Sequence, residues 1–115
     1  MSEKELTPNA FYITNENTWE NVDEGISRQI TNYNNDLMMV KVKFEKGAIG
    51  YKHHHIHSQA SYVAAGKFEV TIDNETKVLE AGDTFFANPN LVHGVVCLEA
   101  GVLIDIFNPV REDFI

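Results

Sequence analysis

Hydrophobic and polar positions alternate with a period of two along most of this chain. The clearest run spans residues 37–45, where an apolar set of positions alternates with a largely charged set: Met38, Val40, Val42 and Phe44 against Met39, Lys41, Lys43 and Glu45. Successive side chains of a β-strand point to opposite faces, so this alternation predicts a half-buried strand. Residues 67–72 alternate in the same way. The turn-forming pair Asp73-Asn74 separates them from residues 76–79, which predicts a hairpin.

Further short strands are predicted elsewhere in the chain. Residues 11–13 and 25–30 have the composition of short strands between Asn-rich turns, and residues 84–87 and 102–107 form apolar runs. No segment shows an apolar stripe with a period of 3.6 residues, which an amphipathic helix requires. We therefore expect an all-β fold of antiparallel strands with little helix.

Length and charge limit the domain organisation and the partners. The 115 residues are 43% hydrophobic and 23% charged, which suits one domain spanning residues 1–115. Seventeen acidic residues against nine Lys and Arg give a formal net charge of −8. Binding to nucleic-acid phosphates requires clustered Lys and Arg, so we expect no nucleic acid as a partner.

Targeting signals and disulfides are not expected in this chain. Residues 1–5 contain no apolar signal segment, and no run approaches the roughly 18 apolar residues that a membrane span requires. The single Cys97 has no partner for an internal disulfide. We expect a cytoplasmic protein with no membrane partner.

All five histidines fall in two short segments, four of them within residues 52–57. Neutral imidazole is the commonest side-chain ligand of transition metals, so this clustering indicates a metal site. In a strand, His53, His55 and His57 share one face, whereas His54 points to the other. We expect His53 and His55 to bind one metal ion, His57 to support a ligand or contact the substrate, and His54 to lie at the surface.

The residues around the histidines resemble the two motifs of the cupin family. The spacing that carries the resemblance covers both motifs: Gly47-x5-His53-x-His55-x3-Gln59-x6-Gly66, and then Gly82 and His93. Cupins are small antiparallel β-barrels of the jelly-roll type, also described as double-stranded β-helices. The resemblance implies this fold, with a barrel core at about residues 37–108. Asn90 departs from the pattern, because this position of the second motif usually holds glycine.

The same resemblance implies a metal site and its ligands. One divalent transition metal would be surrounded by three imidazoles and one amide oxygen: His53, His55, Gln59 and His93. Nickel, zinc, iron and manganese remain open as its identity. Because this ligand set carries no negative charge, the metal would keep its full positive charge and act as a Lewis acid. Cupins commonly form dimers, so we expect a homodimer, with the strand at residues 11–13 as a candidate edge for pairing.

A carboxylate interrupts the apolar run that ends at Phe107. Burying an unpaired carboxylate is unfavourable, so such a residue is normally paired, or has a raised pKa that is put to chemical use. Asp105 shares one strand face with Leu103 and Phe107. If this face is the barrel interior, Asp105 is a candidate general acid or base. The alternative is a structural ion pair, for instance with Arg28 or Arg111.

Two segments are similar, more narrowly, to the small pectin-degradation cupins: Gln59-x2-Tyr62-Val63-x2-Gly66 and Asp105-x-Phe107-x-Pro109-x-Arg111-Glu112-Asp113. Members of that family linearise 4,5-unsaturated uronates, the monosaccharides that pectin and alginate lyases release, into open-chain keto forms. The resemblance implies a small sugar acid as the partner here. It also implies Asp105 as acid or base, Arg111 as carboxylate clamp and Phe107 as pocket wall. For Arg111, a solvated position near the C-terminus is the alternative.

Two other functions are compatible with the same residues. The first is a metal-dependent dioxygenase, because three histidines and a weak fourth ligand leave positions for oxygen on iron(II). The second is a non-catalytic sugar-binding module, since isolated small cupins also serve as sensors. Oxygen uptake by the iron-loaded protein would favour the first, and tight uronate binding without product formation would favour the second.

Overall fold

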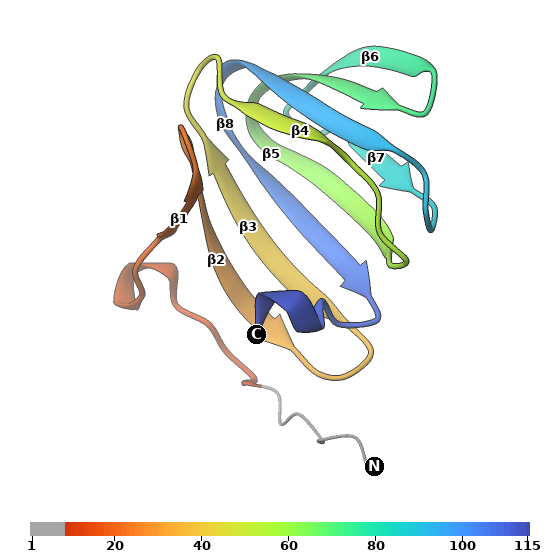
Figure 1. Cartoon of the computed structure of the whole chain (residues 1–115). Coiled ribbons are helices and arrows are strands. Elements are labelled where there is room, and N and C mark those ends of the chain that lie inside the picture. Colours follow the sequence, from red (N-terminus) through yellow and green to blue (C-terminus); the bar gives the residue numbers. More distant parts are fainter. Residues whose placement is uncertain (1–8) are drawn as a thin grey trace.

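Antiparallel β-strands make up most of the structure, a computed structural model that describes residues 9–115 (Figure 1). In chain order the elements are η1 (Thr14–Glu16), β1 (Glu20–Asp23), β2 (Ile26–Tyr33), β3 (Met38–Phe44), β4 (Ile49–His53), β5 (Ser58–Ile72), β6 (Glu75–Glu80), β7 (Thr84–Ala87), β8 (His93–Asn108) and η2 (Glu112–Phe114). Both η elements are short 3₁₀ helices, and the described residues contain no α-helix. The prediction of an all-β, antiparallel barrel is confirmed.

Two long strands, β5 and β8, form the frame of the barrel. They pair along nearly their whole lengths, from Ser58 opposite Asn108 to Ile72 opposite His93. The outer neighbours change along the way, because β8 pairs with β4 in its first half and with β3 in its second. Likewise β7 pairs with the first half of β5, and β6 with its second half. Each long strand therefore belongs to both halves of the barrel, as Figure 1 shows.

Glycines allow the two long strands to bend where the halves of the barrel meet. Gly66 has a φ of +84°, and a Cβ at this position would lie 2.6 Å from the carbonyl oxygens of Glu99 and Ala100. A Cβ on Gly101 would clash with the carbonyl group of Ala65. Only glycine fits such close backbone approaches, and the pairing register shifts in the same region.

Apolar side chains fill the interior next to this bend. Phe44 and Phe68 meet edge to face with ring centroids 5.1 Å apart, an arrangement that aromatic pairs favour. The buried cluster around them comprises Ile26, Phe44, Ala48, Val63, Phe68, Val70, Val95, Cys97 and Leu103. A second cluster comprises Met38, Val40, Phe107 and Val110. Burial also raises the pKa of the Cys97 thiol, so this cysteine behaves as a core residue.

The two clearest strand predictions are confirmed. The run at residues 37–45 forms β3, whose positions Met38 and Val40 are at most 1% exposed. The predicted hairpin joins β5 to β6 through residues 73–74, and Asp73 has a φ of +54° in the turn. The period-two pattern located both elements because one face of each strand packs on the core.

The strand predicted at residues 11–13 is wrong. This segment lies outside the sheet, immediately before η1, and Phe11 is 86% exposed. Asn side chains bind the backbone carbonyls here: Asn17 Nδ2 donates to Ile13 O at 2.8 Å, and Asn32 Nδ2 donates to Asn9 O at 2.8 Å. Such side-chain bonds compete with strand pairing. The homodimer and the pairing of this segment with a second copy both stay predictions.

Within residues 9–115, no helix is both long enough and apolar enough to cross a membrane. The expectation for residues 1–5 concerns a segment outside the described part of the chain.

Candidate metal centre

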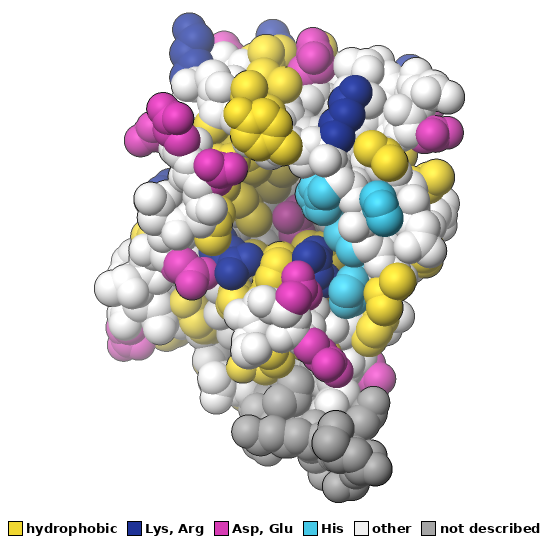
Figure 2. Space-filling view, viewed as in Figure 1, with side chains coloured by type: hydrophobic (Ala, Val, Ile, Leu, Met, Phe, Trp, Pro, Cys, Tyr) yellow, Lys and Arg dark blue, Asp and Glu magenta, His cyan; other side chains and the backbone are white. Residues whose placement is uncertain are grey.

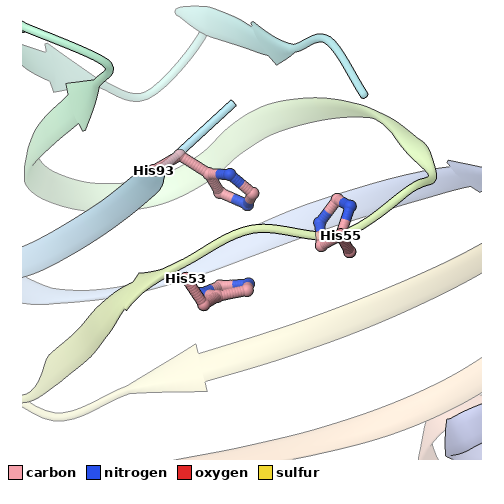
Figure 3. Close-up of side chains that lie close together, drawn as sticks. All are labelled: His53, His55 and His93. Atoms are coloured by element: carbon pink, nitrogen blue, oxygen red, sulfur yellow. The ribbon is translucent and has the colours of Figure 1, made fainter. Parts of the chain in front are cut away.

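Three imidazoles converge at one end of the barrel interior (Figure 3). His53 is the last residue of β4 and pairs with His93, the first residue of β8. Their ring centroids lie 4.5 Å apart, and the ring of His55 lies 4.8 Å from that of His93. One nitrogen from each of the three rings lies within 4.8 Å of the others, so the three histidines are positioned for a single metal ion.

The location of His55 differs from the sequence prediction. Alternation within one strand was expected to bring His53 and His55 together, but β4 ends at His53 and His55 lies in the following loop. The loop before β8 holds it there, because the backbone N–H of Asn90 donates to the carbonyl of His55 at 2.7 Å. Asn90 has a φ of +67°. Asparagine tolerates this left-handed conformation, which explains how it replaces the glycine usual at this position.

Backbone carbonyls fix the proton on each imidazole. The Nδ1 atoms lie 2.9 to 3.0 Å from carbonyl oxygens two residues away in the sequence: His53 with Tyr51, His55 with His57, and His93 with Leu91. A carbonyl oxygen only accepts hydrogen bonds, so Nδ1 carries the proton of each neutral ring. The Nε2 lone pair of each ring is therefore free to bind a metal.

Gln59 presents a further lone pair to the same space. This residue of β5 is 6% exposed, and its Oε1 lies 3.0 Å from His55 Nε2 and 3.1 Å from His93 Nε2. With the ring protons on Nδ1, these contacts bring acceptors together without a hydrogen between them. Such an arrangement is repulsive unless a cation lies among the lone pairs. The side chains thus fit a divalent transition metal, although the role of Gln59 as a ligand stays a prediction.

Burial keeps the rings of His55 and His93 neutral, with Nε2 unprotonated. Desolvation is the largest effect on His93 and lowers its pKa to about 4, and the hydrogen bond to Leu91 O opposes it. Desolvation likewise lowers the pKa of His55. At neutral pH both rings are neutral, so protons do not compete strongly for the lone pairs that a metal would use.

Two of the three clustered histidines, His53 and His93, border a cavity of about 270 Å³. In Figure 2 this face is hollowed, with histidine side chains on one side of the hollow and basic side chains next to them. The polar and aromatic residues that line the cavity include His53, Gln59, His93, Asp105, Phe107, Arg111, Arg28 and Phe114. The volume is at the small end of ligand sites and suits a compact molecule such as a monosaccharide.

Asp105 lies inside this cavity, as the strand parity predicted. It faces Ser61 across the β5–β8 pair, and Ser61 Oγ donates to Asp105 Oδ1 at 2.6 Å. Burial raises the pKa of the carboxyl to about 6, and the Ser61 bond and the charge of Arg111 oppose this rise. Among the described residues the ion-pair alternative is not formed. Arg28 pairs with Glu20 at 2.7 Å, and Arg111 pairs elsewhere.

Arg111 lies at the mouth of the cavity rather than in a solvated tail. It is only 9% exposed, and its Nε and Nη2 donate to Asp113 Oδ1 and Oδ2 at 3.0 and 2.8 Å. Its guanidinium also stacks 4.2 Å from the ring centre of Phe114 and 5.0 Å from that of Phe107. The hydrogen bonds to Arg111 lower the pKa of Asp113. The short helix η2 thereby holds the guanidinium in place.

His57 and His54 have different environments. The ring of His57 lies 5.5 Å from that of His55 and 6.4 Å from that of Phe107. Its Nδ1 is buried and makes no hydrogen bond within the described residues. His57 thus packs beside a candidate ligand, and its role in supporting a ligand or contacting the substrate stays a prediction. His54 is exposed, as predicted.

Two residues of the cavity region received no site role from the sequence. Ser61 shares the inward face of β5 with Gln59. A hydroxyl two residues after a candidate ligand, on the same strand face, was the sequence feature that could have indicated its place in the site. Phe114 contacts both Arg28 and Arg111, with their guanidinium carbons 4.1 and 4.2 Å from its ring centre. No local pattern predicts that contact, because it depends on the path of the chain after β8.

The barrel and its histidine cluster define the class of protein: the chain belongs to the cupin domain family, whose model matches residues 40–107. More particularly, it is 52% identical over 107 residues to the pectin degradation protein KdgF of Dickeya dadantii (strain 3937), covering 91% of this chain and 97% of that protein. The resemblance to the pectin-degradation cupins is therefore confirmed.

Solved structures agree with this relationship. An RmlC-like cupin from Shewanella frigidimarina NCIMB 400 is 46% identical and superposes with a TM-score of 0.92, over 96% of this chain and 100% of that one. KdgF from Halomonas sp. is 42% identical with a TM-score of 0.90, over 93% of this chain and 99% of that one. The fold and the order of its elements are thus shared along nearly the whole chain.

Proposed function

We propose that this protein is a metal-dependent enzyme that opens the ring of 4,5-unsaturated uronates to give open-chain keto sugar acids. The observation that carries the proposal is the 52% identity to a pectin degradation protein along nearly the whole chain. The cavity supports it, because two histidines of the cluster, His53 and His93, line one space of about 270 Å³ together with Asp105 and Arg111. A cation, a proton carrier and a carboxylate-binding group are the parts that this reaction requires.

His53, His55, Gln59 and His93 would hold the metal through three Nε2 atoms and one amide oxygen. When bound, the metal supplies a positive charge that polarises a sugar oxygen. Nickel, zinc, iron and manganese all remain candidates, because availability decides occupancy as much as ligand type does. Phe107, which packs 5.7 Å from His55 between ring centroids, forms the adjoining cavity wall.

Arg111 is the proposed clamp for the sugar carboxylate. A guanidinium carries five N–H donors, and Asp113 takes one from Nε and one from Nη2. The edge formed by Nη1 and the second N–H of Nη2 is left for a carboxylate with two parallel hydrogen bonds. Asp113 and Phe114 would then orient the guanidinium before the sugar arrives.

Asp105 is the proposed proton carrier. In the reaction the bond between C1 and the ring oxygen breaks, and the C1 hydroxyl loses its proton and becomes an aldehyde. A proton is added at C4 while C5 becomes a ketone, so the formula of the sugar is unchanged and no electrons are exchanged. Asp105 lines the cavity and can transfer the proton within the site, which is general acid–base catalysis.

A spectroscopic assay tests this function. The metal-loaded protein is mixed with freshly prepared 4,5-unsaturated galacturonate, and the absorbance of the conjugated double bond is followed beside a protein-free control. We expect faster loss of absorbance, and we expect His55→Ala to abolish the acceleration. Thr71→Ala serves as the control: it removes a half-buried hydroxyl on the same strand as Gln59 but away from the cavity. A decay equal to the protein-free control would refute the proposed function.

The cytoplasmic homodimer expected from the sequence belongs to the same proposal. Its oligomeric state is measured by light scattering after size-exclusion chromatography, at several protein concentrations. A monomer at all of them would contradict the dimer without affecting the proposed reaction.

A further inference from the structure

A buried hydroxyl connects the candidate metal ligands to Asp105. Ser61 is 3% exposed and lies on β5, directly opposite Asp105 on β8. Gln59 Nε2 donates to Ser61 Oγ at 3.0 Å, and Ser61 Oγ donates to Asp105 Oδ1 at 2.6 Å. A line of contacts therefore runs from the imidazoles through the amide and the hydroxyl to the carboxylate, and its last two links, Gln59 to Ser61 and Ser61 to Asp105, are hydrogen bonds.

The direction of these bonds is determined by the chemistry of Ser61. A hydroxyl has a single proton, and an ionised carboxylate only accepts, so the proton of Ser61 points to Asp105. The lone pairs of Ser61 then accept an N–H of Gln59 at 3.0 Å. Together with the hydrogen bond that Gln59 makes to Asp105, this turns the amide so that its oxygen, and not its NH₂ group, faces His55 and His93.

The opposite orientation of the amide has a different consequence. The NH₂ group of Gln59 would then donate to the free Nε2 lone pairs of His55 and His93. Those nitrogens would be satisfied without a metal, and an amide nitrogen has no lone pair to offer a cation. The orientation of this amide therefore decides whether the Nε2 lone pairs of His55 and His93 are available to a metal or are already hydrogen-bonded to Gln59.

We infer that Ser61 is a positioning residue that holds the amide oxygen of Gln59 toward the metal and holds Asp105 in place beside it. Its effect on metal affinity follows from the geometry of this chain alone. Its effect on turnover rests on the proposed function. Some residues do not bind a metal themselves but hydrogen-bond to one of its ligands and orient it. Removing such a residue typically lowers metal affinity by about 10- to 100-fold.

Cobalt(II) titration of the purified metal-free protein tests the first effect. We expect Ser61→Ala to weaken cobalt(II) binding about 10- to 100-fold and to change the visible absorption spectrum of the bound ion. The matched control is Thr31→Ala, which also removes a buried hydroxyl: Thr31 is 4% exposed and its Oγ1 donates to Met39 O at 3.0 Å, away from the cavity. This control should keep the affinity and spectrum of the unmodified protein.

A pair of similarly shaped variants separates the hydroxyl from packing. Ser61→Thr and Ser61→Val differ only in whether the side chain carries a hydroxyl, and both suit a strand. We expect the threonine variant to bind cobalt(II) more tightly than the valine variant by about tenfold. Equal affinities in this pair would refute the inference, even if Ser61→Ala fails to fold.

The kinetic part is measured with saturating metal. Ser61→Ala should lower kcat for 4,5-unsaturated galacturonate while changing KM by less than about threefold, because the proposed carboxylate contact at Arg111 is retained. Ser61→Thr should recover part of the lost kcat. If neither the unmodified protein nor its variants turn over the sugar, the proposed function fails. The cobalt(II) results still decide the role of Ser61 in that case.

Discussion

The interior of this barrel has an apolar part and a polar part, and the same two strands build both. On the apolar side, Phe68 of β5 is 0% exposed and packs edge to face against Phe44. On the polar side, β5 places Gln59 and β8 places His93 and Asp105 around the cavity. The two parts differ in chemistry but not in their backbone framework.

This difference shows where stability and function reside. Burial of the apolar part is favourable in itself, at roughly 25 cal/mol per Å². Burial of the polar part is unfavourable unless every group finds a partner. Among the polar residues, Asp105 has a raised pKa and three imidazoles are left with free lone pairs. We therefore expect the apolar part to carry the stability and the polar part to carry the chemistry.

The largest expected effect is on the apolar side. Phe68→Ala should lower the free energy of unfolding by about 3–5 kcal/mol, because it leaves a cavity in a fully packed site. Urea denaturation followed by circular dichroism measures this. The folded fraction should keep its cobalt(II) affinity, since Phe68 is not among the residues that line the metal-centre cavity. Phe68→Leu is the milder control; a loss below about 1 kcal/mol in the alanine variant would contradict this division of roles.

The next prediction concerns Asp105, where one substitution should raise the stability of the metal-free protein and lower its activity. Asp105→Asn should stabilise the metal-free protein at pH 8 by about 1–3 kcal/mol, because burial raises the pKa of Asp105 to about 6 from 3.8. The folded state binds this proton more tightly than the unfolded state, so stability should fall as the pH rises between about 4 and 6. The asparagine variant should lack this fall, and its kcat should drop about 10²- to 10⁴-fold. Thermal unfolding over this pH range checks the sign.

A smaller effect is expected at Arg111. Arg111→Lys keeps the positive charge but cannot form two parallel hydrogen bonds. We expect the KM for 4,5-unsaturated galacturonate to rise about tenfold, equivalent to about 1.4 kcal/mol of binding. Steady-state kinetics of the metal-loaded variant measures it. An unchanged KM together with an unchanged kcat would show that Arg111 does not bind the sugar carboxylate.

The smallest effect is expected at Asp113, whose pKa is shifted in the opposite direction to that of Asp105. Asp113 has a lowered pKa because Arg111 donates to its carboxylate. Its stabilising contribution is present at neutral pH and is lost as the pH falls through its lowered pKa, the reverse of Asp105. Because Asp113 is largely exposed, Asp113→Asn should lower the free energy of unfolding by only about 0.2–1 kcal/mol. Subtracting the stability-versus-pH curve of each variant from that of the unmodified protein should give slopes of opposite sign.

The sequence predicted the apolar part better than the polar one. Alternation located β3 and the β5–β6 hairpin, because burial on one face leaves a period of two. The same alternation placed Asp105 correctly inside the barrel. It failed at residues 11–13, where asparagine side chains take the place of strand pairing.

The polar part depends on contacts that periodicity does not encode. His55 reaches the cluster from a loop, held by a hydrogen bond from Asn90 far along the chain. Phe114 packs between Arg28 and Arg111 because η2 turns back across the barrel mouth. Ser61 was visible as an inward-facing hydroxyl, but its role required the positions of both neighbours. The resemblance to cupin motifs supplied the candidate ligands; their arrangement required the fold.

The bend of β5 and β8 near Gly66 and Gly101 determines how the chain tolerates insertions and deletions. Residues of β8 before the bend, including His93, keep their orientation when the length of the chain changes beyond it. Deleting one residue between Gly101 and Asp105 would shift the second half of β8 by one position and turn Asp105 and Phe107 to the outer face. Natural variation in length should therefore be excluded from the segment between Gly101 and Asp105.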